Sequence, residues 1–108
     1  MADTLKVLGQ ANPAAVTLFP LYTATGTTAA VSSIIVCNTG GVTATFRISV
    51  AVAGAADNLK QYIYYNLPIE SHNTFIATIG ITLADSDIIR VYASNADLAF
   101  SVFGVEIT

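Results

Sequence analysis

Apolar and polar side chains alternate through the middle of the chain, and this alternation predicts a β-strand. Within residues 43–52, every second position from Phe46 onward is apolar, namely Phe46, Ile48, Val50 and Val52. A period of two is typical of an extended strand that buries one face and exposes the other. We therefore expect residues 43–52 to form a half-buried antiparallel strand with these four side chains in the core.

Turn residues predict which segments pair with one another. The sequence Asn38-Thr39-Gly40-Gly41 separates residues 43–52 from the apolar run at residues 31–37, so we expect these two segments to pair as a hairpin. The polar turns at residues 84–87 and 95–97 are expected to close the last two hairpins.

The same signals recur along the whole chain and indicate an all-β fold. Further strands are predicted at residues 5–8, 17–23, 61–67, 74–83, 88–94 and 98–107. We expect a single antiparallel β-sandwich or jelly-roll-like domain of about eight strands. Residues 16–108 form this domain in the prediction, and residues 1–15 form a short extended N-terminal arm or an edge strand.

Several predicted strands are apolar on both faces. In residues 88–92, one face carries Ile88 and Tyr92 and the other carries Ile89 and Val91. A two-layer sandwich buries only one face of each sheet, so the second apolar face predicts contacts with other subunits. The candidate interface residues are Leu5, Val7, Tyr62, Tyr64, Ile88 and Tyr92.

A tyrosine cluster at residues 62–65 permits three interpretations. Alternation places Tyr62 and Tyr64 on one face and Ile63 and Tyr65 on the other, and we expect the second pair to lie in the core. Tyr62 and Tyr64 then pack against a neighbouring subunit, contact a partner elsewhere in an assembly, or stack on a sugar ring.

Composition narrows the classes of function. Of 108 residues, 54% are hydrophobic and only 10% are charged, whereas about 25% charged residues is usual for a soluble domain. Four Lys and Arg residues are too few for a nucleic-acid surface, and no apolar run approaches the ~18 residues of a membrane span. The N-terminus lacks the pattern of a secretory signal. We expect neither nucleic acid nor membrane as partner, and a low-charge surface that is covered by subunit contacts.

The residues needed for catalysis or metal binding are sparse. The single histidine, His72, lies in a turn beside Ser71, and the single cysteine, Cys37, is expected to be a small buried apolar residue. Asp85 and Asp87 form a pair of carboxylates that suits either a strand-ending turn or a calcium ion, and the turn is favoured because no further acid is near. We expect no enzyme activity, no catalytic residues, no metal site and no cofactor.

Four segments resemble a family of small virion structural proteins, mostly uncharacterised, from tailed bacteriophages, cyanophages and prophages. They are residues 1–15 (MADTLKVLGQANPAA), 31–38 (VSSIIVCN), 45–50 (TFRISV) and 100–106 (FSVFGVE). The resemblance covers nearly the whole chain and implies a virion component present in many copies, made in the host bacterial cytoplasm.

Among virion roles, we expect capsid decoration, because the small size, the low charge, the arm at residues 1–15 and the lack of a catalytic site fit it. A homotrimeric cement protein would stabilise the shell through subunit contacts and through its N-terminal arm, with the major capsid protein as partner. A component of the tail, baseplate or fibre, bound to tail proteins, is the alternative. A carbohydrate-binding β-sandwich module is a further alternative, and would use an exposed tyrosine groove.

Overall fold

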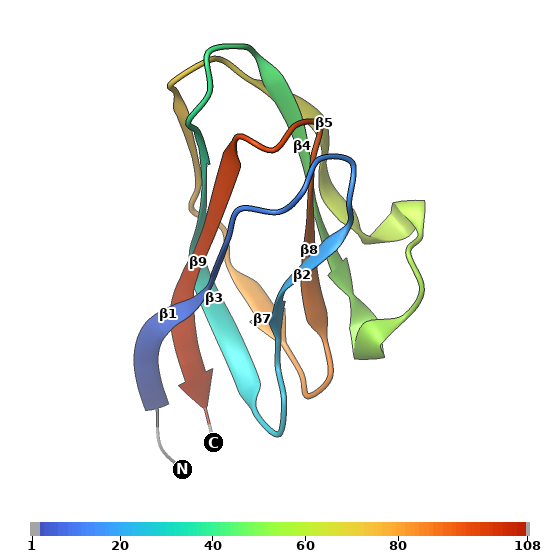
Figure 1. The fold of residues 1–108 in the computed structure, drawn as a ribbon. Helices are drawn as coiled ribbons and strands as arrows, with labels where there is room; N and C mark the ends of the chain where they lie inside the picture. The colour runs from blue at the N-terminus through green and yellow to red at the C-terminus, as the bar shows by residue number, and fades with distance from the viewer. Residues whose placement is uncertain (1–2, 108) are drawn as a thin grey trace.

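The computed structural model describes residues 3–107, which form two antiparallel β-sheets packed face to face (Figure 1). Its nine strands are β1 (Asp3–Ala11), β2 (Phe19–Thr23), β3 (Thr28–Asn38), β4 (Ala44–Ala51), β5 (Tyr62–Ile69), β6 (Thr74–Ala77), β7 (Ile81–Leu83), β8 (Ile88–Ala93) and β9 (Leu98–Ile107). Two short 3₁₀ helices, η1 (Val52–Gly54) and η2 (Leu59–Gln61), lie between β4 and β5.

The order of the strands is that of a jelly roll. The five-stranded sheet has the order β1-β9-β3-β6, with β7 also paired to β3, and the four-stranded sheet has the order β2-β8-β4-β5. Successive strands mostly alternate between the two sheets, as in a double Greek key. The predicted all-β, jelly-roll-like sandwich is thus confirmed. The segment predicted as one strand at residues 74–83 is interrupted and supplies both β6 and β7.

The three predicted hairpins are wrong, because the turns carry the chain from one sheet to the other. β3 and β4 belong to different sheets, as do β7 and β8, and β8 and β9. At the first crossing, the buried amide of Asn38 donates to the carbonyl oxygens of Val42 (2.8 Å) and Ile69 (3.1 Å), which holds the crossing segment across the end of the sandwich. A turn signal predicts that the chain reverses, but it does not predict which sheet receives the next strand.

The core lies between the sheets and is built from the inward positions of the strands. Phe46 and Ile48 are fully buried as predicted, and the Phe46 ring lies 5.2 Å from Phe75 and 6.4 Å from Phe100 between centroids. Val50 also packs against the core. Val52 does not, because it begins η1 and is 69% exposed, so its predicted core position is wrong.

The N-terminal segment is an edge strand of the five-stranded sheet. β1 pairs with β9 from Asp3 to Ala11, with a bulge between Val7 and Gly9. Because Gly9 has no side chain, β1 can approach the Leu21 carbonyl of β2 closely on the inner side. Residues 1 and 2 lie outside the described part of the chain.

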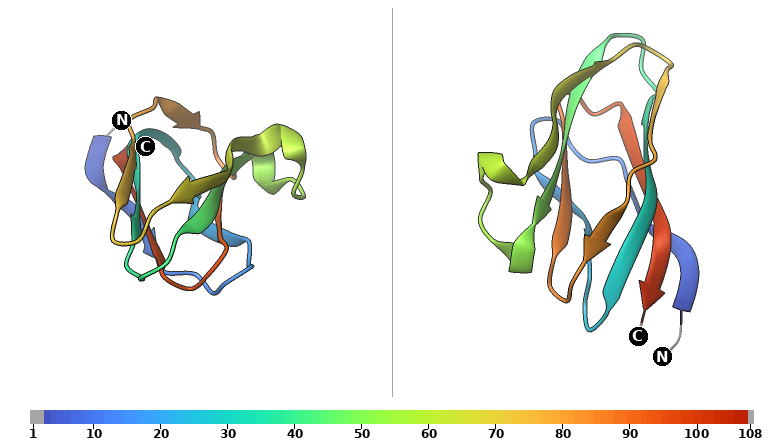
Figure 2. Two further views of the ribbon diagram at one scale, coloured as in Figure 1. Left: turned by 90° about the horizontal axis from the view of Figure 1, so that it is seen from above. Right: turned by 180° about the vertical axis from the view of Figure 1, so that it is seen from behind.

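The segment between β4 and β5 projects from the side of the four-stranded sheet (Figure 2). We call this segment, residues 52–61, the excursion. Arg90 of β8 holds it in place, since its Nη1 donates to the Ala55 carbonyl (2.8 Å) and its Nη2 to the Gly54 carbonyl (3.3 Å). Register places Ser49 of β4 opposite Arg90, and the buried Ser49 hydroxyl finds no hydrogen-bond partner within residues 3–107. The excursion therefore shields part of the outer face of this sheet.

Candidate interface surfaces

The outer face of the five-stranded sheet carries large apolar side chains on each of its three long strands. Cross-strand register aligns Leu5 with Val105, Val7 with Phe103, and Ile35 with Ile76. We call this surface the apolar face, defined by Leu5, Val7, Ile35, Ile76, Phe103 and Val105. Leu5 is 84% exposed, Ile76 62% and Val7 48%, so the rim of the apolar face is open to solvent.

Charged side chains are nearly excluded from this surface. Among the described strand positions that face outward on this sheet, only Asp3, at one end of β1, carries a charge. Lys6, on the same strand, alternates to the inner side and pairs with Glu106. Large exposed apolar patches without charge are typical of interaction surfaces rather than of free monomer surfaces.

A shallow hollow of about 380 Å³ lies on the apolar face, with Leu5 at its border. It lies beside Gly104, where β3 bulges at Ser32 against β9. A Cβ at Gly104 would collide with the Ala30 carbonyl oxygen, so the close approach of the two strands requires glycine. The surface therefore offers both a protruding Leu5 and an apolar depression next to it.

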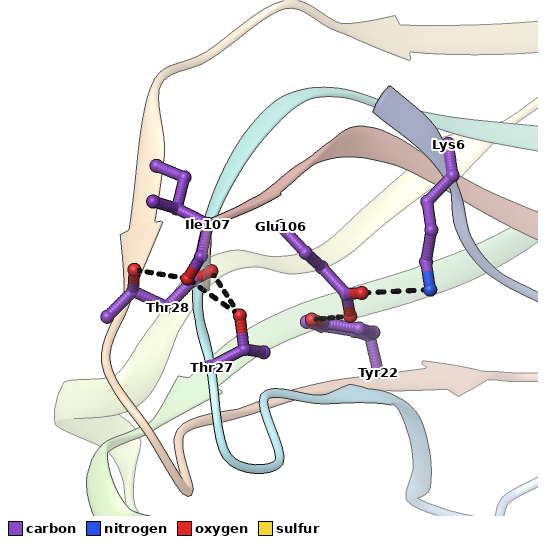
Figure 3. A network of polar contacts seen from close by, with 6 residues as sticks. All are labelled: Lys6, Tyr22, Thr27, Thr28, Glu106 and Ile107. Atoms are coloured by element: carbon purple, nitrogen blue, oxygen red, sulfur yellow. Dashed lines mark hydrogen bonds and ion pairs between the residues drawn. The ribbon is translucent and has the colours of Figure 1, made fainter. Parts of the chain in front are cut away.

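A polar network holds β1 in place behind this surface (Figure 3). The Glu106 carboxylate on β9 accepts from Lys6 Nζ on β1 (2.8 Å) and from the Tyr22 hydroxyl on β2 (2.6 Å), which joins the two sheets. These two hydrogen bonds lower the pKa of Glu106, while burial and the bond to Glu106 raise the pKa of Tyr22. Next to it, the Thr27 hydroxyl donates to the Ile107 carbonyl at the end of β9 (2.9 Å).

The outer face of the four-stranded sheet carries a second cluster, of tyrosines around Arg47. The Arg47 guanidinium carbon lies 4.4 Å from the ring centroid of Tyr65 and 4.2 Å from that of Tyr92. Tyr62 meets Tyr65 edge to face at 5.1 Å, and its hydroxyl donates to Asp57 (2.8 Å). We call these four residues, Arg47, Tyr62, Tyr65 and Tyr92, the tyrosine–arginine cluster.

The predicted orientation of the tyrosines is partly wrong. Tyr64 faces the interior, where its ring contacts Phe75 (5.2 Å between centroids), whereas Tyr65 is 50% exposed and Ile63 is 41% exposed. The reason is that β5 shifts register twice against β4, and Asn66 adopts a positive φ of 53°. These irregularities break the alternation of faces on which the prediction depends.

The six candidate interface residues thus fall into separate places. Leu5 and Val7 lie together on the apolar face, and Tyr62 and Tyr92 belong to the tyrosine–arginine cluster. Ile88 is half-buried beside Gly54 of the excursion, and Tyr64 is internal. The sequence analysis missed Phe103, Val105, Ile76 and Arg47, although the alternation along residues 99–105 carries the signal for the first two.

The two aspartates considered as calcium ligands accept hydrogen bonds from backbone N–H groups, and the single histidine lies in an exposed turn. Asp87 is 8% exposed and accepts from the backbone N–H groups of Ala53 (2.8 Å) and Ala84 (2.9 Å), and Asp85 accepts from that of Gly26 (2.7 Å). His72 is exposed in a turn with a φ of 57°.

The lone cysteine is not fully buried. Cys37 is half-buried on the outer side of β3, opposite Ala99, so the expectation that it is buried is wrong. The reason is that the outer side of β3 has no second layer over it.

Neither a metal cluster nor a spanning helix is found among residues 3–107. No group of three or more His, Cys, Asp or Glu side chains there is placed to hold a metal ion. No helix in the same residues is long and apolar enough to cross a membrane.

Comparison with known proteins does not assign a family. No protein-family model matches the chain, and no curated protein matches it.

Proposed function

We propose that this protein is a non-enzymatic structural subunit of a bacteriophage virion that assembles with copies of itself through the apolar face. The observation that carries the proposal is the apolar face itself, which is solvent-open and almost free of charge in the isolated chain. Interfaces of permanent assemblies are depleted of charged residues in this way. Jelly rolls are frequent in viral capsids, which supports the virion role by analogy of fold alone.

A homotrimer acting as a capsid decoration protein is the specific form of the proposal. In a closed ring, each copy uses one surface patch toward one neighbour and a different patch toward the other. The protruding Leu5 and the hollow that it borders are the parts of the apolar face that would contact a neighbouring copy. β1 would then contribute both to the sheet of its own subunit and to the contact with its neighbour.

Light scattering coupled to size-exclusion chromatography tests the assembly. The wild-type protein should have three times the 11.2 kDa mass of one chain. Leu5→Asp and Ile76→Asp place a charge on exposed positions of the apolar face and should shift the mass toward that of one chain, because burying an unpaired charge is costly. Val42→Asp is the matched control, since Val42 is 61% exposed but lies in the crossing between β3 and β4. A wild-type protein that is monomeric at every concentration contradicts the proposal.

Immunogold labelling of purified phage particles tests the location. Label over the capsid supports decoration, whereas label on the tail, baseplate or fibres identifies the alternative structural role. Absence of label from the particles contradicts both virion roles. The carbohydrate-binding alternative concerns a different surface, the tyrosine–arginine cluster.

A further inference from the structure

Arg47 is held in a fixed position on the outer face of the four-stranded sheet. Its guanidinium group lies between the rings of Tyr65 and Tyr92, at 4.4 and 4.2 Å from their centroids. A guanidinium stacked on aromatic rings is attracted by their π-electrons and loses most of its conformational freedom. The side chain is therefore ordered before any ligand arrives.

The hydrogen-bonding groups of Arg47 are only partly used. Its Nε donates to the Asn66 side-chain oxygen at 2.7 Å. The guanidinium also lies within hydrogen-bonding reach of the Tyr62 hydroxyl and lowers the pKa of that group. Within residues 3–107, no acidic group forms an ion pair with Arg47. A guanidinium can bind a carboxylate through two parallel hydrogen bonds. Among the described residues, Arg47 is thus an ordered cation without a carboxylate partner.

Tyrosine rings extend this cation into a platform. Tyr65 is 50% exposed and Tyr62 stands against it edge to face, with 87° between the ring planes. Burial and Asp57 raise the pKa of Tyr62, whereas the nearby Arg47 lowers it, and the net direction is upward. The Tyr62 hydroxyl therefore stays protonated and donates a hydrogen bond to the Asp57 carboxylate, which is thus already engaged.

We propose that the tyrosine–arginine cluster binds a carboxylate-bearing sugar, with the carboxylate on the guanidinium of Arg47 and the sugar ring on the exposed Tyr65. An exposed tyrosine ring offers an apolar surface of the size that the C–H face of a sugar can cover. The side-chain amide of Asn66, which accepts from Arg47 Nε, lies beside the cation as a partner for hydroxyl groups. An acidic peptide would use the cation but not this combination of ring and polar groups.

The net charge of the chain restricts the ligand further. At −3, the protein repels long polyanions, and Arg47 is one of only four Lys and Arg residues. The site therefore suits a glycan with an isolated acidic residue rather than a densely charged polymer. This inference does not depend on the proposed assembly, which uses the opposite sheet.

Titration followed by NMR chemical shifts tests the site on the full chain. The probes are 3′-sialyllactose and digalacturonate, with lactose as the neutral match of the first and a capped Gly-Asp-Gly peptide as a carboxylate without a sugar. We expect at least one acidic sugar to bind with a Kd below about 10 mM and at least about tenfold more tightly than lactose or the peptide.

Substitutions assign the binding to the cluster. Tyr65→Ala and Arg47→Lys should each weaken binding about tenfold, because lysine keeps the charge but loses the planar fork and the stacking. Lys60→Gln removes a cation from the exposed excursion and should leave the affinity unchanged. Circular dichroism checks that each variant is folded. The proposal is overturned if neither acidic sugar binds, if the peptide or lactose binds equally well, or if folded Tyr65→Ala keeps the wild-type affinity.

Discussion

Lys6 and Glu106 form an ion pair of 2.8 Å that fastens the first strand of the chain to the last. Tyr22 completes it from the opposite sheet, so one carboxylate joins β1, β9 and β2 (Figure 3). A charged residue that points inward from an edge strand also discourages open-ended pairing with other sheets. Lys6 therefore stabilises β1 and keeps its outer, apolar side available for a specific contact.

Acid should weaken the fold through Glu106. Its pKa is lowered in the folded protein, first by the hydrogen bond from Lys6 and then by that from Tyr22. A lowered carboxyl pKa contributes stability that is present above the unfolded value, about 4.3, and is lost as the pH falls through the folded value. Glu106→Gln should therefore lower Tm at pH 7 and flatten the loss of Tm in acid, measured by calorimetry at fixed protein concentration. Glu70→Gln, in an exposed turn, is the control. Parallel acid profiles for wild type and Glu106→Gln would refute the role of this carboxylate.

Gly104→Ala should be strongly destabilising. The added methyl group collides with the backbone of β3 at Ala30, which cannot move without disturbing the central ladder of the five-stranded sheet. We expect a loss of about 1–3 kcal/mol in the free energy of unfolding, measured by urea denaturation. Gly41→Ala is matched in chemistry, and nothing lies within 4 Å of its added Cβ, so it should be nearly neutral. Equal effects of the two substitutions would show that the close approach at Gly104 is not constraining.

Asp87 should matter for stability and not for calcium binding. Its carboxylate accepts the backbone N–H groups of Ala53 and Ala84 in a nearly buried position. Asp87→Ala leaves these donors without their partner and should cost about 1–3 kcal/mol in the free energy of unfolding. Calcium at millimolar concentration should leave the Tm of the wild type unchanged. A rise in Tm with calcium that Asp87→Ala abolishes would instead establish an ion site.

Removal of β1 should damage the fold as well as the assembly. β1 pairs with β9 along its length, so deletion of residues 1–11 exposes the edge of β9 and uncovers part of the core. We expect aggregation or a loss of cooperative unfolding, and circular dichroism as a function of temperature would measure it. Leu5→Ser is the milder change, because Leu5 is 84% exposed, and it should keep the monomer fold while weakening self-association. A soluble, cooperatively folding deletion variant would show that β1 acts as a detachable arm.

Alternation in the sequence was sufficient to predict most strands but not their partners. Phe46 and Ile48 are in the core as expected, because local spacing determines which side chains share a face. Pairing depends on long-range packing, and the buried Asn38 amide directs the chain across to the other sheet where turn residues alone suggested a hairpin. Local sequence does not encode this difference.

The candidate surfaces were predictable to the extent that their strands are regular. Leu5 and Val7 lie on a regular stretch of β1, and both are exposed on the apolar face. In β5, the positive φ of Asn66 and two register shifts bring Tyr65 outward and Tyr64 inward, which reverses the expected arrangement. A residue-by-residue alternation has no means of locating such bulges.

The order of the strands in the five-stranded sheet determines which pairings can form while the chain is being synthesised. β3 pairs only with strands that follow it in the chain, and β1 pairs with β9. Because the ribosome makes the chain from its N-terminus, both strands must wait until Leu98–Ile107 has emerged before their central ladders can form. Pairings between distant segments also fold slowly. Leu5 and Val7 of β1 therefore have no neighbouring strand until β9 has been made, whereas β3 can pair earlier with β6 and β7. The exposed apolar side chains of β1 are thus the last part of the apolar face to be fixed in place.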